Sequence, residues 1–190
     1  KENREMGIYF EDAALAENLE MMATFDAGRI SSCRAKPMGA AILFQGGPDA
    51  LLVEDVPVCD EGVAALAGIA EKKIEIMMYV FSHQFGKYDK LVRSLRQAVR
   101  RGVTVRLIHD ARVISTIEGI SATLRDLKQW GIEVRLAEVS SLGKTPEGNY
   151  HAKAMQVDGR YVMAGSNNWT DAGSHENREV ALLVHSEKMA

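Results

Sequence analysis

Residues 151–168, which read HAKAMQVDGRYVMAGSNN, decide how the end of this chain folds. Two short segments rich in strand-forming residues flank the pair Asp158-Gly159. This arrangement predicts a β-hairpin, because both residues of an Asp-Gly pair tolerate a positive φ angle. If the loop has two residues, Val157 pairs with Arg160. Lys153 then lies opposite Ala164, and by the same register His151 lies opposite Ser166.

This register predicts a polar cluster on one side of the hairpin. Side chains alternate between the two faces of a strand, so we expect His151, Lys153, Ser166 and Asn168 to point the same way. We expect Gly165 to leave the backbone open to an approaching ligand. Lysine, serine and asparagine offer hydrogen-bond donors suited to an oxyanion, and a histidine can be a nucleophile or a proton carrier near neutral pH.

Glu179 adds a carboxylate to this set. It precedes the apolar run 180–184, which predicts a strand with Glu179 at its end. From there the carboxylate can hold one imidazole nitrogen and leave the other free to attack, as in catalytic triads. The stretch contains neither the carboxylate cluster typical of Mg²⁺ sites nor the Cys/His set typical of Zn²⁺ sites. The residues therefore indicate a phosphate site that uses no metal and no other cofactor.

The spacing of these residues resembles the HKD signature of the phospholipase D superfamily: His151-x-Lys153-x4-Asp158-x6-Gly165-Ser166-x-Asn168. Glu179 fits the same pattern. The resemblance implies that His151 forms a phosphohistidine intermediate and that Glu179 orients it. It further implies that Lys153, Ser166 and Asn168 hold the phosphate. Asp158 and Gly165 would be structural, with Asp158 closing the hairpin turn.

The resemblance also implies a partner, because members of this superfamily use two such histidines. This chain carries one motif and so resembles the single-motif branch, which includes bacterial nonspecific endonucleases and the mitochondrial cardiolipin hydrolase and Zucchini proteins. Members of that branch work as homodimers. We therefore expect a homodimer with the active site on its two-fold axis, where His151 of each copy faces one phosphorus.

The charge balance restricts how nucleic acid can bind. The 190 residues carry a formal net charge of -3, whereas nonspecific nucleic-acid binders usually have an excess of Lys and Arg. Binding must then rest on a local patch. The best candidate is one face of the helix predicted over residues 88–101, with Lys90, Arg93, Arg96 and Arg100 as possible contacts.

The remaining pattern predicts an α/β fold. Apolar segments at 40–44, 74–81, 103–108 and 132–136 are typical of strands, and helices are predicted over 60–72, over 88–101 and, behind a Ser115-x-x-Glu118 capping box, up to Trp130. We expect a mixed, mainly parallel sheet layered with helices, a phospholipase D-like sandwich. Residues 1–36 are predicted to be an acidic helical extension with a linker, and residues 37–190 the catalytic domain.

Three functions follow from these observations. The first is a metal-independent phosphodiesterase with a phosphohistidine intermediate, an endonuclease acting on DNA or RNA. The second keeps this chemistry and hydrolyses a phospholipid such as cardiolipin. The third is a non-catalytic protein that binds nucleic acid or phosphate. No apolar run approaches the roughly 18 residues of a transmembrane segment, and no signal peptide is visible, so a cytoplasmic location is expected.

Overall fold

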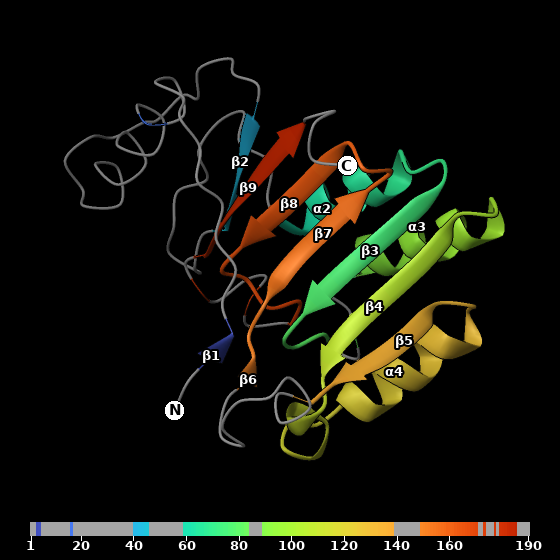
Figure 1. Cartoon of the computed structure of the whole chain (residues 1–190), viewed down its shortest axis with the longest axis vertical. Helices are drawn as coiled ribbons and strands as arrows, with labels where there is room; N and C mark the ends of the chain where they lie inside the picture. The colour runs from blue at the N-terminus through green and yellow to red at the C-terminus, as the bar shows by residue number, and fades with distance from the viewer. Residues whose placement is uncertain are drawn as a thin grey trace.

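A computed structural model of the chain describes residues 3–4, 16, 40–45, 59–83, 89–138, 149–170, 173, 177 and 179–185. These residues form a seven-stranded sheet with the strand order β2-β9-β8-β7-β3-β4-β5 (Figure 1). Its strands are β2 (Ala40–Gln45), β3 (Lys73–Met78), β4 (Thr104–Asp110), β5 (Glu133–Ala137), β7 (Lys153–Val157), β8 (Tyr161–Gly165) and β9 (Glu179–His185). A separate parallel pair joins β1 (Asn3–Arg4) to β6 (Asn149–Tyr150).

The fold class predicted from the sequence, a mixed α/β sheet layered with helices, is confirmed. Within the sheet, β3, β4 and β5 run parallel, as their helical connections require. The pairs of β3 with β7, β7 with β8, β8 with β9 and β9 with β2 are antiparallel. The parallel share is therefore smaller than the sequence indicates, because the hairpin and the last strand extend the sheet in the antiparallel sense.

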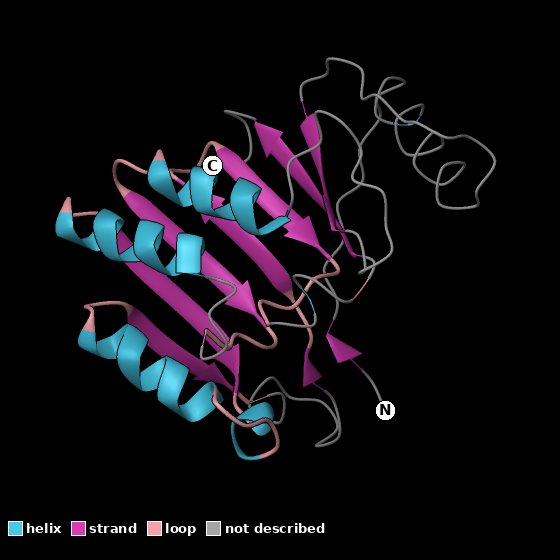
Figure 2. Cartoon of the chain, turned by 180° about the vertical axis from the view of Figure 1, so that it is seen from behind, coloured by secondary structure: helices cyan, strands magenta, loops and turns pink. Residues whose placement is uncertain are grey.

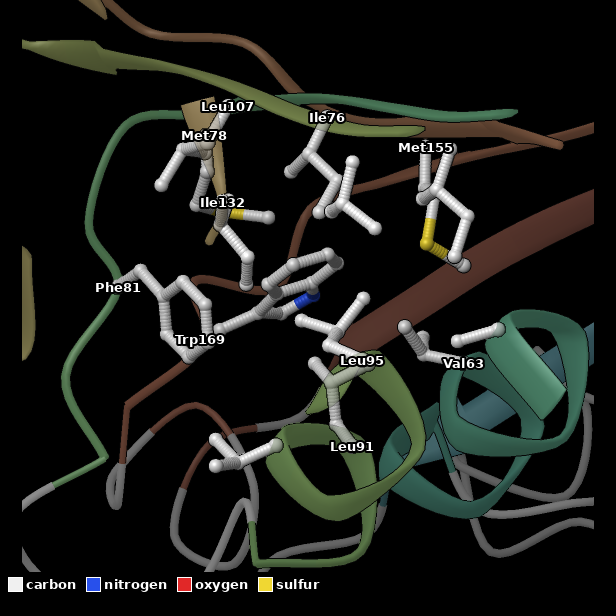
Figure 3. Close-up of a cluster of buried hydrophobic side chains, with 14 of the residues drawn as sticks. Val63, Ile76, Met78, Phe81, Leu91, Leu95, Leu107, Ile132, Met155 and Trp169 are labelled. Atoms are coloured by element: carbon white, nitrogen blue, oxygen red, sulfur yellow. The ribbon is translucent and has the colours of Figure 1, made fainter. Parts of the chain in front are cut away.

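Three α-helices cover one face of the sheet (Figure 2): α2 (Cys59–Gly68), α3 (Asp89–Arg100) and α4 (Ile120–Gln129). In β3 and β4 alternate residues are buried, so one face of each strand packs under these helices. Leu91 and Leu95 of α3 point into this core together with Ile76, Met155 and the indole of Trp169 (Figure 3). Burial of these side chains removes apolar surface from water and holds the helices on the sheet.

The start of α4 differs from the prediction. Ser115 ends a short 3-10 helix, η1 (Arg112–Ser115), and the backbone N–H of Thr116 bonds back to the carbonyl of Val113. The chain therefore turns once more before α4 begins. Gly119, with φ of 83°, occupies the N-cap position, and no side chain caps it. The predicted capping box is wrong because Ser115 belongs to the preceding turn.

Other predictions concern parts of the chain that lie outside the described residues. The acidic helix predicted within residues 1–36 is one of them, apart from the strand Asn3–Arg4 and a helical position at Ala16. The division at residue 36 stays a prediction. Within the described ranges, no helix combines the length and the apolar composition needed to cross a bilayer.

Candidate active site

The hairpin forms where the sequence predicts it, but with another register. Asp158 and Gly159 have φ angles of 55° and 72°, and the N–H of Arg160 donates to the carbonyl of Val157 at 3.0 Å. Val157 then pairs with Tyr161, so Arg160 is an additional loop residue. The predicted pairing of Val157 with Arg160 is wrong by one residue, because an Asp-Gly turn can be followed by one extra residue before the strands pair.

The shifted register separates the polar residues into two groups. Ala154, rather than Lys153, pairs with Ala164, so one step further Lys153 comes beside Gly165. A shift by one residue moves a side chain to the other face of the strand. Ser166 therefore does not share the face of Lys153 in the way the two-residue loop predicts. The structure brings His151 to Lys153 and, separately, Ser166 to Glu179.

The first group is a histidine and a lysine in direct contact. The Nζ atom of Lys153 lies 2.9 Å from Nε2 of His151 and donates to the His151 carbonyl at 3.1 Å. Lys153 is 6% exposed, and its Nζ lies 5.1 Å from the ring centre of Tyr79. The ring of Tyr79 also packs against the imidazole of His151, with 4.6 Å between ring centres. The group thus presents a positive charge beside the Nε2 atom of a half-buried histidine.

The second group connects the end of β8 to the start of β9. The Ser166 hydroxyl donates a short hydrogen bond to Oε2 of Glu179 and accepts the N–H of Val180 at 3.2 Å. The other oxygen of Glu179 accepts from Nδ2 of Asn177 at 3.1 Å. Among the described residues, the partners of Glu179 are therefore Ser166 and Asn177 rather than His151. In this structure its carboxylate orients the serine hydroxyl.

Trp169 fixes the segment that carries Ser166 and Asn168. Its side chain is fully buried and contacts Phe81 edge-on at 5.1 Å between ring centres. The Trp169 backbone bonds on both sides to the chain that follows β3: its N–H donates to Val80, and its carbonyl accepts from Ser82. Asn168 is half-buried beside this anchor. The hairpin segment is thereby attached to the end of β3, close to Tyr79 and His151.

Gly165 packs closely against strand β9. A Cβ atom placed there would lie 2.5 Å from Cβ of Ala181 and 2.6 Å from the carbonyl oxygen of Val180. The expectation that this glycine leaves the backbone open to a ligand is wrong, because strand β9 occupies that space. Gly165 permits the close approach of β8 and β9 that brings Ser166 to Glu179.

Asp158 lies at the far end of the hairpin, away from His151. Its carboxylate accepts three backbone N–H groups from the connection between α2 and β3, those of Glu71, Lys72 and Lys73, at 2.8–2.9 Å. Burial alone would raise the pKa of Asp158, but these three hydrogen bonds and the nearby Lys72 lower it below the ordinary value. The contacts agree with a structural role and show that the side chain ties the turn to β3.

The predicted nucleic-acid contacts lie along α3, which we call the basic face: Lys90, Arg93, Arg96 and Arg100. All but Arg96 are exposed. Arg96 is half-buried, with its guanidinium 4.7 Å from the ring centre of Trp130. The α3 helix lies between α2 and α4 on the face of the sheet that the helices cover (Figures 1 and 2).

The sequence did not indicate two residues that lie beside the segment of His151, Tyr79 and Asp110. Asp110 ends β4 and is fully buried; its carboxylate accepts the N–H groups of Tyr150 and Arg112. Tyr79 follows β3 and Asp110 is the last residue of β4, which runs parallel to β3. The carboxyl ends of parallel strands meet at one sheet edge, where sites tend to form. The position of Tyr79 and Asp110 at these strand ends is therefore the feature of the sequence that could have indicated them. Among the described residues, no group of three or more His, Cys, Asp or Glu side chains is arranged to hold a metal ion.

Comparison with known structures identifies the fold. The Nuc protein of Salmonella typhimurium, a phospholipase D family member, aligns with a TM-score of 0.60 at 23% identity and covers 78% of this chain and 86% of its own. NucT from Helicobacter pylori aligns with a TM-score of 0.55 at 21% identity, over 67% of this chain and 77% of its own. Phosphatidylserine synthase from Haemophilus influenzae aligns with a TM-score of 0.61 at 17% identity, over 90% of this chain and 42% of its own.

Sequence comparison points the same way. Phospholipase D of Rickettsia bellii is 27% identical over 112 residues, 58% of this chain and 51% of the relative. The mitochondrial cardiolipin hydrolase of Xenopus tropicalis is 30% identical over 115 residues, which are 60% of this chain and 48% of the relative. The chain thus spans about half the length of these curated relatives. The family model described as "Cardiolipin synthase, PLD-like domain" matches residues 64–190, and the chain therefore belongs to this phospholipase D-like family.

Proposed function

We propose that this chain is a metal-independent phosphodiesterase that works through a phosphohistidine at His151 and cleaves DNA or RNA. The observation that carries the proposal is the 2.9 Å contact between Lys153 Nζ and His151 Nε2. An ammonium group can only donate, so Nε2 accepts in this contact. A phosphate oxygen that takes over the hydrogen bond from Lys153 would release the Nε2 lone pair beside its phosphorus, and this proximity favours attack. Phosphodiester hydrolysis by members of the phospholipase D-like family supports it.

The reaction would have two steps. In the first, Nε2 of neutral His151 bonds to phosphorus, the bond to the leaving oxygen breaks, and a second, protonated histidine gives that oxygen its proton. In the second, water transfers a proton to this histidine and attacks phosphorus, the P–N bond breaks, and His151 is released. Both histidines return to their starting states. Each step therefore has a positioned nucleophile and a proton carrier.

The second histidine would come from another copy of the chain, with the site on a two-fold axis. This homodimer follows from the single motif and stays a prediction. A test is to mix tagged wild-type copies with His151→Asn copies and to isolate the mixed dimers. A shared site leaves a mixed dimer without turnover, because either the nucleophile or the acid is missing. Mixed dimers that keep about half of the wild-type activity would show independent sites.

Phosphate binding would use groups from both parts of the site. Lys153 supplies the fixed positive charge, and Ser166 and Asn168 supply neutral donors. Glu179 holds the Ser166 hydroxyl in place, as the hydrogen bond between them shows. The role assigned to Glu179 from the sequence, a hydrogen bond to His151, stays a prediction for the assembled dimer.

Nucleic acid is the favoured substrate because of the basic face. Lys90, Arg93 and Arg100 are exposed along one helix, an arrangement suited to successive phosphates of a backbone. The principal alternative, a phospholipid such as cardiolipin, is supported by the relatives named phospholipase D and mitochondrial cardiolipin hydrolase. A non-catalytic phosphate-binding protein is the third possibility.

One set of assays separates these three functions. Single-stranded DNA, RNA, duplex DNA and cardiolipin-containing vesicles are incubated with the protein in excess EDTA, and the products are measured. We expect cleavage of nucleic acid, lost in His151→Asn and kept in His185→Asn. His185 is a matched control, since it is exposed and stacks on Tyr161 at the opposite end of the hairpin. Products from vesicles alone would establish the lipid alternative, and no product from any substrate would leave only the binding function.

A further inference from the structure

We propose that Asp110 and Tyr79 are positioning residues for His151: Asp110 fixes the backbone that carries the imidazole, and Tyr79 fixes the ring. This inference rests on the proposed function, in which His151 is the nucleophile. Neither residue belongs to the 151–179 motif. Both reach the site from the carboxyl ends of neighbouring parallel strands, β3 and β4.

Asp110 acts on the backbone just before His151. One carboxylate oxygen accepts the N–H of Tyr150, and the other accepts the N–H of Arg112 at 2.7 Å. The side chain is fully buried, so loss of either bond would leave a buried polar group without its partner. A buried carboxylate that holds two backbone groups restricts where Tyr150 can lie. It thereby restricts the position of the next residue, His151.

His109 makes the end of β4 a rigid support for Asp110. Its Nε2 accepts the N–H of Phe81 at 3.2 Å, and its Nδ1 lies 2.8 Å from the carbonyl oxygen of Asp110. Because an N–H group can only donate and a carbonyl can only accept, Nδ1 carries the proton and the ring is neutral. The buried imidazole thus links β4 to the chain that follows β3, which is where Tyr79 lies.

Tyr79 acts on the histidine ring and on the segment around it. Its N–H donates to the carbonyl of Ala152 at 2.8 Å, and its hydroxyl accepts from Nδ2 of Asn149 at 3.3 Å. Its ring packs at 60° against the imidazole and lies beneath the Lys153 ammonium. The segment 149–153 is therefore held on both sides of His151, by Asp110 before it and by Tyr79 after it.

This arrangement matters for rate because the nucleophile must be aligned with phosphorus. A displacement of about 1 Å can lower a rate by about 100-fold even when the chemical groups are unchanged. A positioning role therefore affects kcat more than KM. A role in folding alone would lower the fraction of folded protein and leave the turnover of folded molecules unchanged.

The test compares Asp110→Asn, Tyr79→Leu and Tyr79→Phe with Asp126→Asn as a matched control. Asp126 lies on α4, and its partner among the described residues is His83 rather than any residue of segment 149–153. Asp110→Asn and Tyr79→Leu should lower kcat by roughly 10- to 100-fold with KM within about twofold. Tyr79→Phe keeps the ring and should recover most of the loss. Asp126→Asn should match the wild type.

Two further readouts keep the proposal falsifiable. Rates are expressed per folded molecule, from thermal unfolding and active-site titration, and the ring nitrogens of ¹⁵N-histidine are followed by NMR, with His151→Gln giving the assignment. We expect the His151 signals to shift or broaden in Asp110→Asn and Tyr79→Leu. Unchanged kcat per folded molecule, or unchanged His151 signals, overturns the proposal. If Asp110→Asn does not fold, Tyr79→Leu decides it.

The same experiment separates this proposal from the proposed function. A wild-type protein that cleaves no phosphodiester refutes the function, and the NMR comparison then still decides whether Asp110 and Tyr79 position His151. A wild-type protein that is active, with Asp110→Asn and Tyr79→Leu equally active per folded molecule, refutes the positioning role and leaves the function standing.

Discussion

The carboxylate of Asp158 accepts the backbone N–H of Lys73 at 2.8 Å, although the two residues are 85 positions apart in the sequence. The bond joins the turn of the β7–β8 hairpin to the first residue of β3. Glu71 and Lys72 donate to the same carboxylate. The residue that closes the motif's turn thus also fixes the connection between α2 and β3.

Replacing Asp158 should destabilise the fold. Asp158→Ala removes three hydrogen bonds to a charged acceptor and should lower the free energy of unfolding by about 2 kcal/mol. Folding lowers the pKa of Asp158 below its ordinary value of 3.8. The ionised carboxylate therefore stabilises the fold at pH values above 3.8, and this stabilisation is lost as the pH falls through the pKa of the folded state. Urea unfolding at pH 7 and at pH 3 measures this difference.

Glu133→Gln serves as the control for that prediction. Glu133 pairs with Arg106 at 3.1 Å on an exposed strand edge, where an ion pair contributes less than about 1 kcal/mol. The Glu133→Gln variant should therefore have almost the same free energy of unfolding as the wild type at pH 7 and at pH 3. If Asp158→Ala is as stable as this control at pH 7, the three hydrogen bonds contribute no net stability.

Stability should also depend on pH through His109. Burial lowers the pKa of His109, and this outweighs the hydrogen bond to the Asp110 carbonyl and the Asp110 charge, which both raise it. Below about pH 6.5 the unfolded chain therefore binds a proton at His109 that the folded chain does not bind. The free energy of unfolding falls as the pH drops from there toward the pKa of His109 in the folded state. Between pH 7.5 and 5.5 the wild type should lose on the order of 1 kcal/mol more than His109→Gln. Equal losses in the two proteins would show that His109 does not titrate differently on folding.

The sequence predicted the turn of the hairpin but not the pairing of its strands. The Asp-Gly pair predicts positive φ angles at Asp158 and Gly159, and the structure has them. Yet two-residue and three-residue loops share this signal, and the extra residue Arg160 decides which face each following side chain takes. Local preferences fix the turn, whereas the register depends on pairing with strands outside the hairpin, β3 and β9.

Tyr79 and Asp110 illustrate a second limit. Each is an ordinary polar residue at the end of an apolar strand, and nothing in its immediate neighbours indicates chemistry. Their role depends on the sheet order, which places β7 beside β3 and β3 beside β4. The strands themselves were predicted correctly from their apolar runs. Which strand ends lie around His151 is a property of the assembled sheet.

The basic face should determine the salt dependence of nucleic-acid binding. Arg93→Gln and Arg100→Gln each remove an exposed charge, and each should reduce the slope of log Kd against log salt by about 1 if that side chain contacts a phosphate. Arg106→Gln is the matched control, since Arg106 is exposed on the sheet face away from the helices. Fluorescence anisotropy with a single-stranded oligonucleotide measures the slopes. Slopes equal to the control would show that binding does not use α3.

Arg96 should behave differently from its neighbours on the basic face. Its guanidinium lies over Trp130 of the α4 C-terminus, so Arg96→Gln removes a packing contact between α3 and α4 together with the charge. We expect a loss of about 0.5–1 kcal/mol of stability, which Arg100→Gln, at an exposed position of the same helix, does not show. Thermal unfolding of the two variants therefore distinguishes a cation that packs from one that is available to a ligand. Equal stability of the two would remove the packing role.

Gly165 should not tolerate a side chain, because strand β9 lies against it. An added Cβ would lie within 2.7 Å of Ala181 Cα as well as meeting its Cβ, and backbone atoms of a paired strand cannot move aside cheaply. Gly165→Ala should lower the free energy of unfolding by about 1–3 kcal/mol. It should also displace β9 and with it the Glu179 carboxylate that holds Ser166. Gly68→Ala is the control, since a Cβ there meets nothing within 4 Å and alanine favours the helix. Chemical unfolding of both variants tests the prediction, and a Gly165→Ala protein as stable as Gly68→Ala would show that β8 and β9 do not need this close approach.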